Sequence, residues 1–252
     1  MKNSIVIFLL LFGGIATAQD TPVFEQATTA YNEAAYEKAI DLYTSILEDG
    51  QHSAALYYNL GNSYYKLNDI PNSIYFYEKA LLLAPNDAEI KNNLGYAQQM
   101  TLDAIDTLPE TGLARFYKKI TNALSFDQWA YTAVAFMFLF VLLYILFYYF
   151  RYSSRKRWAF IGSLVCLFTS LVTLAFAYIA YEDFNADRPA IIFADEIEIQ
   201  AEPNAASDAV FVLHAGTKVN IVEELNDWKK IMLTDGKTGW VSAEHLKILK
   251  DF

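Results

Sequence analysis

Two long stretches without a charged residue constrain this chain more than any other feature of its sequence. They are Trp129–Phe150, with 22 residues, and Trp158–Tyr181, with 24. As α-helices they would measure about 33 and 36 Å, enough to cross a hydrocarbon core of about 30 Å. Tryptophan and tyrosine occur near their ends, where the membrane interface favours them. The sequence therefore predicts two transmembrane helices, at 129–150 and 158–181.

The start of the chain and the loop between the spans predict the orientation. Lys2 precedes an apolar run of eleven residues, and small residues follow it up to Ala18. This is the pattern of a secretory signal peptide over residues 1–18, with an uncleaved membrane anchor as the alternative. The loop 151–157 has four basic residues and no acidic residue, which favours the cytoplasm. We therefore expect both flanking segments to lie outside the cytoplasm.

One face of the second span carries small residues that are candidates for helix packing. They are Gly162, Cys166, Ser170, Thr173 and Ala177. Small side chains at this spacing let another helix approach closely, either the first span or a partner's helix. The alternative is that they have no packing role. Apart from the Cys166 thiol, neither span holds an ionisable group, which disfavours transport.

The segment before the spans contains a repeat of 34 residues. Within residues 54–87 the pattern positions are Tyr57, Leu60, Gly61, Tyr64, Ser73, Tyr77, Ala80 and Pro85. This pattern resembles the tetratricopeptide repeat (TPR), a pair of packed helices. One period upstream the register recurs more loosely, and one period downstream Leu94-Gly95 begins a third repeat that stops after its first helix. We expect a TPR domain over residues 20–102, with two repeats and a capping helix.

The resemblance to TPR proteins implies a concave peptide-binding groove formed by the first helix of each repeat. The positions expected to face it are Tyr31, Tyr58, Asn62, Tyr65, Asn92, Tyr96 and Gln99. Tyrosine stacking and amide hydrogen bonds would then capture a partner; the alternative is that the tyrosines only fill the spaces between helices. The family's carboxylate clamp needs basic residues where this chain has Ala55, Tyr58 and Asn59, so that mode of binding is not expected.

Residues 103–128 connect the repeats to the first span. Leu113, Phe116, Ile120 and Leu124 recur at helical spacing, and Arg115, Lys118 and Lys119 lie largely opposite them. An apolar face opposite a basic face is typical of a helix that lies on a membrane surface. We expect a short amphipathic helix here, with a plain linker as the alternative.

The segment 182–252 changes to short β-rich stretches separated by turn residues, which predicts a small barrel. The expected strands are Glu196–Gln200, Ala209–Leu213, Lys218–Glu223, Lys229–Leu233, Thr238–Val241 and Lys247–Leu249. Four motifs, at 213–217, 227–228, 235–236 and 239–241, follow the order and spacing of the bacterial SH3-like family, which the segment resembles. The arginine often found in that family's first motif is replaced here by Glu198–Ala201, which puts an inherited ligand preference in doubt. Trp228 and Trp240 are candidate ligand platforms, or alternatively they pack the core of so small a domain.

Charge and motifs exclude several classes of function. Residues 20–128 hold 15 acidic and 7 basic residues, and residues 182–252 hold 14 and 7, so both segments would repel nucleic acid. The chain has one cysteine, three scattered histidines, no glycine-rich phosphate loop and no nucleophile motif. We therefore expect no enzyme activity, no catalytic or metal-binding residues and no cofactor.

The order of these parts describes a multidomain membrane protein: an all-α helical repeat, a two-helix transmembrane hairpin and a small all-β SH3-like barrel. It resembles the TPR membrane proteins of the Bat aerotolerance operon of Bacteroides-type bacteria. The resemblance implies von Willebrand A-type membrane proteins and a MoxR-type ATPase system as partners. We expect a scaffold in the bacterial inner (cytoplasmic) membrane, with both soluble domains in the periplasm. The alternative is a protein that attaches to peptidoglycan through its barrel.

Overall fold

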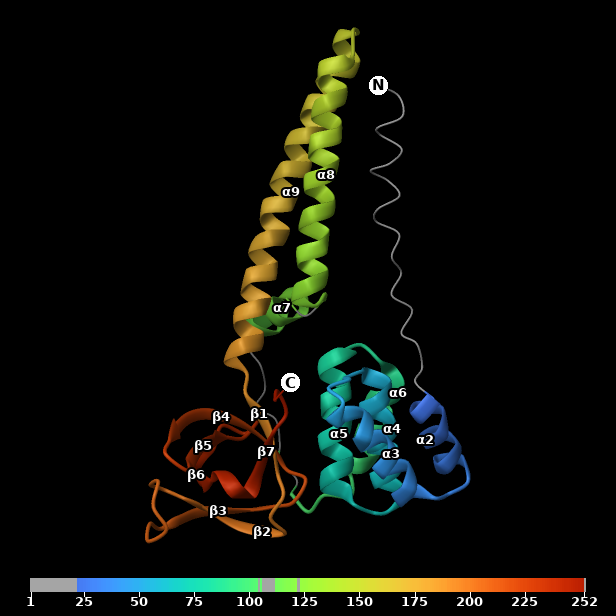
Figure 1. Ribbon diagram of the computed structural model, residues 1–252. Helices are drawn as coiled ribbons and strands as arrows, with labels where there is room; N and C mark the ends of the chain where they lie inside the picture. Colours follow the sequence, from blue (N-terminus) through green and yellow to red (C-terminus); the bar gives the residue numbers. More distant parts are fainter. Residues whose placement is uncertain (1–21, 104, 106–111, 122, 252) are drawn as a thin grey trace.

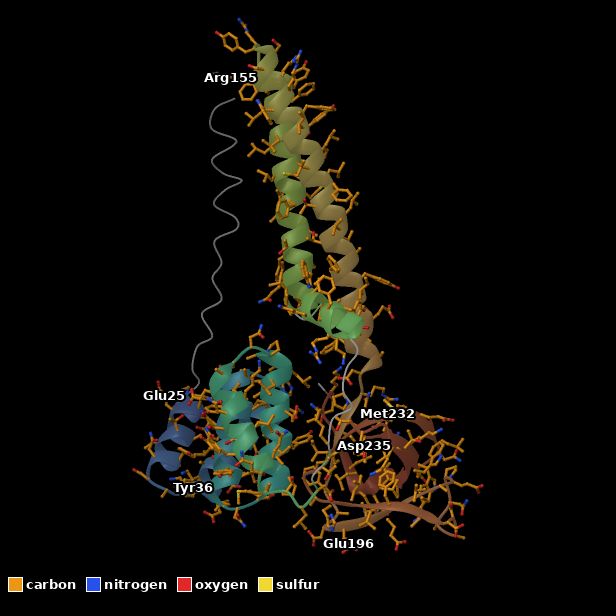
Figure 2. The ribbon with its side chains drawn as sticks, turned by 180° about the vertical axis from the view of Figure 1, so that it is seen from behind. Glu25, Tyr36, Arg155, Glu196, Met232 and Asp235 are labelled. Carbon is orange, nitrogen blue, oxygen red and sulfur yellow. The ribbon has the colours of Figure 1, made fainter. Side chains whose placement is uncertain are left out.

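The computed structural model describes residues 22–103, 105, 112–121 and 123–251. The predicted signal peptide, residues 1–18, therefore lies outside the described residues. Figure 1 shows three parts: a block of short helices, a long helical hairpin, and a β-sheet beside the helical block. Both soluble parts lie at one end of the hairpin. Figure 2 shows Arg155 at the opposite tip, far from Glu25 in the helices and Glu196 in the sheet.

The helical block contains five described helices, and polar caps begin the last three of them. The helices are α2 (Pro22–Asn32), α3 (Tyr36–Glu48), α4 (Ala54–Lys66), α5 (Ile70–Leu83) and α6 (Ala88–Gln98). The side chains of Ser53, Asp69 and Asp87 accept hydrogen bonds from backbone N–H groups at the starts of α4, α5 and α6. Asn68 takes the left-handed conformation in the turn between α4 and α5, at φ 60°.

The helices of the central repeat pack closely because small residues face large ones. Ser73 in α5 donates a hydrogen bond of 2.9 Å to the carbonyl oxygen of Gly61 in α4. The ring of Tyr77 covers Gly61, so closely that a Cβ on this glycine would lie 2.6 Å from Tyr77 Cδ1. Tyr43, Tyr57 and Tyr77 are fully buried and supply much of the block's core.

Among the described residues, two helices are long and apolar enough to cross a membrane: α8 (Phe126–Tyr149) and α9 (Ser153–Ala186). They pack along each other as a hairpin (Figure 1). The predicted loop 151–157 is shorter than expected, because α9 already begins at Ser153 and includes the basic residues Arg155, Lys156 and Arg157. The expected end at Tyr181 is also exceeded, by five residues. The predicted bounds are the ends of the uncharged runs, where the chain is expected to leave the bilayer. At its start the helix continues past them because lysine and arginine are good helix formers.

The C-terminal part is one antiparallel sheet of seven strands in the order β3-β2-β6-β5-β4-β1-β7. The strands are β1 (Pro189–Ile192), β2 (Glu196–Gln200), β3 (Ala209–His214), β4 (Lys218–Leu225), β5 (Trp228–Met232), β6 (Thr238–Ser242) and β7 (Leu246–Ile248). The six strands expected from the sequence are present, with ends shifted by at most two residues. Strand β1 was not expected. It pairs with both β4 and β7 and contacts α5 of the helical block.

The sheet and the helical block share a core. Ile191 of β1 and Leu249, which follows β7, are completely buried in one apolar cluster with residues of α4, α5 and α6. The outer face of α5 supplies the polar contacts: Tyr75 donates to the carbonyl oxygen of Ile248 and to the Asp251 carboxylate, at 3.3 and 3.0 Å. The soluble parts therefore pack into one unit through the outer face of α5.

Charged pairs surround this shared core. Lys218 of β4 pairs with Glu78 of α5 at 2.7 Å, and Lys79 of α5 contacts Asp251. Glu78 and Lys79 are both buried, an arrangement that needs partners because an unpaired buried charge is costly. The barrel therefore covers the outer, convex side of the repeats and leaves the opposite side open.

Candidate functional site

A pocket of about 180 Å³ opens on the side of the helical block that the sheet does not cover. It is lined by Tyr31 of α2, by Asn62, Tyr65 and Lys66 of α4, by Tyr77 of α5, and by Asn93 and Tyr96 of α6. The first helices of successive repeats thus supply nearly all of its lining, as expected for a TPR groove. The volume lies below the ~300–1,000 Å³ typical of small-molecule sites, so it suits one side chain of a bound peptide.

Hydrogen bonds fix the floor of this groove. Asn62 Oδ1 accepts from the Tyr77 hydroxyl at 2.6 Å and from Asn93 Nδ2 at 3.0 Å. Asn93 Nδ2 also donates to the Tyr58 hydroxyl at 2.8 Å, and Tyr58 in turn donates to Glu89 at 2.7 Å. This network holds α4, α5 and α6 in a fixed relation, so the groove is formed before any partner binds.

Burial raises the pKa of three tyrosines in or beside the groove. Burial, followed by the hydrogen bond to Glu89, raises the pKa of Tyr58 to about 12. Burial also raises the pKa of Tyr77 and of Tyr31 above the usual range. The lining of the groove offers hydroxyl groups, amide groups and ring faces, together with the Lys66 ammonium. Such a surface can hydrogen-bond a peptide backbone and attract an acidic side chain.

The structure places four of the seven predicted groove residues in the pocket: Tyr31, Asn62, Tyr65 and Tyr96. Tyr58 lies beside the pocket and bonds Glu89 and Asn93 instead of lining it. Asn92 and Gln99 are exposed and are not among the residues that line the pocket.

Sequence reasoning missed Lys66, Tyr77 and Asn93. Lys66 stands four residues after Asn62, and Asn93 stands three residues before Tyr96, so helical spacing from the predicted residues could have found both. Tyr77 was treated only as a packing position of the repeat. It is one, since it covers Gly61, and its hydroxyl also reaches the groove floor.

The predicted small-residue face of α9 lies against α8. Cys166, Ser170, Thr173 and Ala177 are buried, and Gly162 is half-buried next to Leu143. Ser170 donates a hydrogen bond of 2.8 Å to the carbonyl oxygen of Ala133 in α8. Of the two partners considered from the sequence, the first span is therefore the one that this face contacts.

The two tryptophans of the barrel differ in exposure. Trp240 is buried in β6, with the Lys230 ammonium 5.7 Å from its ring centre, so it packs the domain. Trp228 at the start of β5 is half-buried. Of the two, Trp228 is therefore the more accessible candidate for a ligand platform.

Comparison with known families agrees with this division of the chain. The family model of the tetratricopeptide repeat matches residues 54–87. The family model of the bacterial SH3 domain matches residues 198–247. A search of curated proteins found no match to the chain. The predicted fold class, a TPR-containing helical module, two long apolar helices and an SH3-like antiparallel sheet, is confirmed.

Proposed function

We propose that this protein is a non-catalytic, membrane-anchored scaffold that binds a protein partner through the TPR groove. The observation that carries the proposal is the open pocket between α2, α4 and α6, lined by tyrosine and asparagine and backed by a fixed hydrogen-bond network. Because the barrel covers the convex side of α5, the groove is the face of the repeats left for a partner.

Anchoring follows from the surface of the hairpin. Large apolar side chains of α8 and α9 face outward; Phe138 is 70 % exposed and Phe168 is 68 % exposed. Water-soluble proteins rarely expose so continuous an apolar surface. The basic tip around Arg155 favours the cytoplasm and so favours the periplasm for both soluble parts (Figure 2).

We further propose that this protein has the role implied by its resemblance to the Bat operon proteins. In that role the groove holds a segment of a von Willebrand A-type membrane protein, in a complex served by a MoxR-type ATPase. The order of the parts supports this proposal: a TPR module and an SH3-like barrel on either side of a two-helix hairpin.

The test is co-purification of the tagged full-length protein in mild detergent. Lys66→Ala and Tyr96→Ala remove exposed pocket side chains, so the fold should survive. Asn92→Ala and Gln99→Ala are matched controls on the same surface, outside the pocket. The proposal expects the first pair to lose a partner that the second pair retains. Equal recovery from all four variants would overturn it.

A second candidate is attachment to peptidoglycan through the barrel, which the match to the bacterial SH3 domain supports. The full-length protein must be used for its test, because Ile191 and Leu249 of the barrel complete their burial against the helical block. Sedimentation with purified sacculi that is lost in Trp228→Ala but kept in Tyr96→Ala would favour this candidate over the groove.

A further inference from the structure

The short helix α7 (Gly112–Thr121) has an exposed aromatic surface that contacts little else in the described part of the chain. Phe116 is 61 % exposed and Tyr117 is 44 % exposed. By helical spacing these residues share a face with Ile120, and Arg115 and Lys119 lie on the other side. An apolar face of this kind needs a cover that is itself partly apolar.

Two hydrogen bonds place α7 at a defined height along the hairpin. The Trp129 indole N–H donates to the carbonyl oxygen of Thr121 at 3.2 Å. The Tyr117 hydroxyl donates to the Asp183 carboxylate at 3.0 Å. Trp129 is the first residue of the uncharged run in α8, and Asp183 follows the uncharged run of α9. Helix α7 therefore lies at the level where the bilayer would begin, across the base of the hairpin (Figure 1).

Aromatic residues gather at the same level. Phe126 lies 5.8 Å from Tyr181 and 5.3 Å from Phe184, measured between ring centres. Tyrosine, like the tryptophan at position 129, is enriched in the interfacial layer of membranes. The surroundings of α7 are thus those of the boundary between lipid tails and headgroups.

The charge of α7 differs from that of the soluble parts around it. Its sequence, GLARFYKKIT, contains three basic residues and no acidic residue. The rest of the soluble chain is strongly acidic, with 14 acidic and 7 basic residues in 182–252 alone. An anionic surface would be repelled by these parts and attracted to α7.

We propose that α7 lies in the outer interface of the bilayer and that Arg115, Lys118 and Lys119 bind the headgroups of anionic phospholipids. The proposal rests on the membrane anchoring proposed above, but not on the groove. It also explains why α7 carries basic residues on the outer side of the membrane, where the positive-inside rule predicts few of them. Each basic residue near an anionic membrane favours binding by about five-fold.

The sole cysteine makes a site-specific test possible. Cys166→Ala removes the native thiol, and Phe116→Cys, Phe138→Cys or Val210→Cys then carries an environment-sensitive dye. Phe138 reports the spanning region and Val210, exposed on β3 at the far side of the barrel, reports the aqueous domain (Figure 1). Full-length protein is reconstituted in nanodiscs of phosphatidylcholine alone or mixed with phosphatidylglycerol, and quenching by brominated lipid is measured.

The expected result is strong quenching at position 116, increased by phosphatidylglycerol, and none at position 210. Substituting Arg115, Lys118 and Lys119 by glutamine should abolish the increase and leave quenching at position 138 unchanged. If position 116 behaves like position 210 in both lipids, α7 is not interfacial and the inference is wrong. If the increase survives the glutamine substitutions, the headgroup assignment is wrong. Absence of quenching at position 138 would instead overturn the anchoring itself.

Discussion

Gly61 shows how a single residue sets the distance between two helices. Its missing side chain lets Tyr77 lie across α4, and a Cβ there would meet Tyr77 Cδ1 at 2.6 Å and Cε1 at 2.7 Å. The sequence predicted this role, because Gly61 occupies one of the small-residue positions of the 34-residue pattern. The contact also orients the Tyr77 hydroxyl toward Asn62 and so shapes the groove.

Gly61→Ala should therefore destabilise the helical block by about 1–3 kcal/mol, the usual cost of overpacking a core. Thermal unfolding of the full-length protein in detergent, followed by circular dichroism, measures the change. Gly95→Ala is the matched control, since Gly95 occupies the same position one repeat later and has open space around it. That control should be neutral or slightly stabilising, because alanine is the better helix former. Equal effects of the two changes would refute this account of Gly61.

Asp103 links the end of the repeats to the barrel. Its carboxylate accepts from the backbone N–H and the Nδ1 of His214, both at 2.7 Å, and from the Thr217 hydroxyl. Burial alone would raise the pKa of Asp103, but the hydrogen bonds from Thr217 and His214 outweigh it, and the pKa lies below its usual range. Because the pKa is lower in the folded state, the stabilisation is present at neutral pH and is lost as acid protonates the group.

The pH dependence of stability should reflect this carboxylate. The contribution of Asp103 is complete above the ordinary aspartate pKa of about 3.9 and declines as the pH falls through the lower folded value. Asp103→Asn should lower the free energy of unfolding by about 1–3 kcal/mol at neutral pH. The difference between wild type and variant should shrink as the pH falls below the ordinary aspartate pKa. Unfolding midpoints of the wild type and the variant, measured from pH 7 to pH 3, check this. Parallel curves over that range would contradict it.

The groove shows what residue-level prediction could and could not achieve. Tyr31, Asn62, Tyr65 and Tyr96 follow from the repeat register. Extending the same register to α6 selected Tyr96, which lines the pocket, and Asn92 and Gln99, which do not. It did not select Asn93, whose side chain bonds Asn62 and Tyr58. The rotation of the last helix depends on its packing against α4 and α5, and the period of the repeat does not contain that information.

Among the elements, the hairpin depends on a seam of small residues. Ser170 contributes a hydrogen bond to Ala133 and, like Cys166 and Ala177, is buried between α8 and α9. In a membrane the helices gain no hydrophobic energy by meeting, so close packing and such hydrogen bonds hold them together.

Ser170→Leu should loosen the hairpin, because the larger side chain cannot fit where Ala133 is 5 % exposed. Val165→Leu is the control on the lipid-facing side, since Val165 is 58 % exposed. Hydrogen exchange of α8 in detergent should rise about ten-fold in the first variant, as expected for a loss near 1.4 kcal/mol, and stay unchanged in the second. Unaltered exchange in Ser170→Leu would show that the seam does not hold the helices.

The strands were predictable where their sequences alternate and turn residues bound them. Glu196–Gln200 alternates acidic and apolar residues, and β2 occupies that same range. Strand β1 escaped prediction because Pro189–Ile192 is short, follows a helix directly and is buried at every position. Its inner and outer faces are both covered, by the sheet and by α5, so no alternation marks it.

At the scale of the whole molecule, the contact between barrel and repeats divides the surface into a covered side and an open side. Asp251 is central to it, since both Tyr75 and Lys79 of α5 contact its carboxylate. The sequence did not predict this contact, because the two parts are separated by the entire hairpin.

Asp251→Ala should weaken this docking by about 1–3 kcal/mol, the cost of removing a charged hydrogen-bond partner. Amide hydrogen exchange should then increase in α5 and in β1 together, because the two elements share one core. Glu244→Ala, which removes an exposed carboxylate elsewhere on the barrel, should leave both elements protected. An increase confined to the barrel would contradict the shared core.

The central claim, that the groove holds a protein partner, is tested most directly by photo-crosslinking in living cells. A photoreactive phenylalanine replaces Tyr96, which is 60 % exposed at the pocket rim, or Asn92, which lies on the same helix outside the pocket. The account predicts a discrete adduct from position 96, identifiable by mass spectrometry as an envelope protein, and no such adduct from position 92. Equal crosslinking from both positions, or none from position 96, would contradict it.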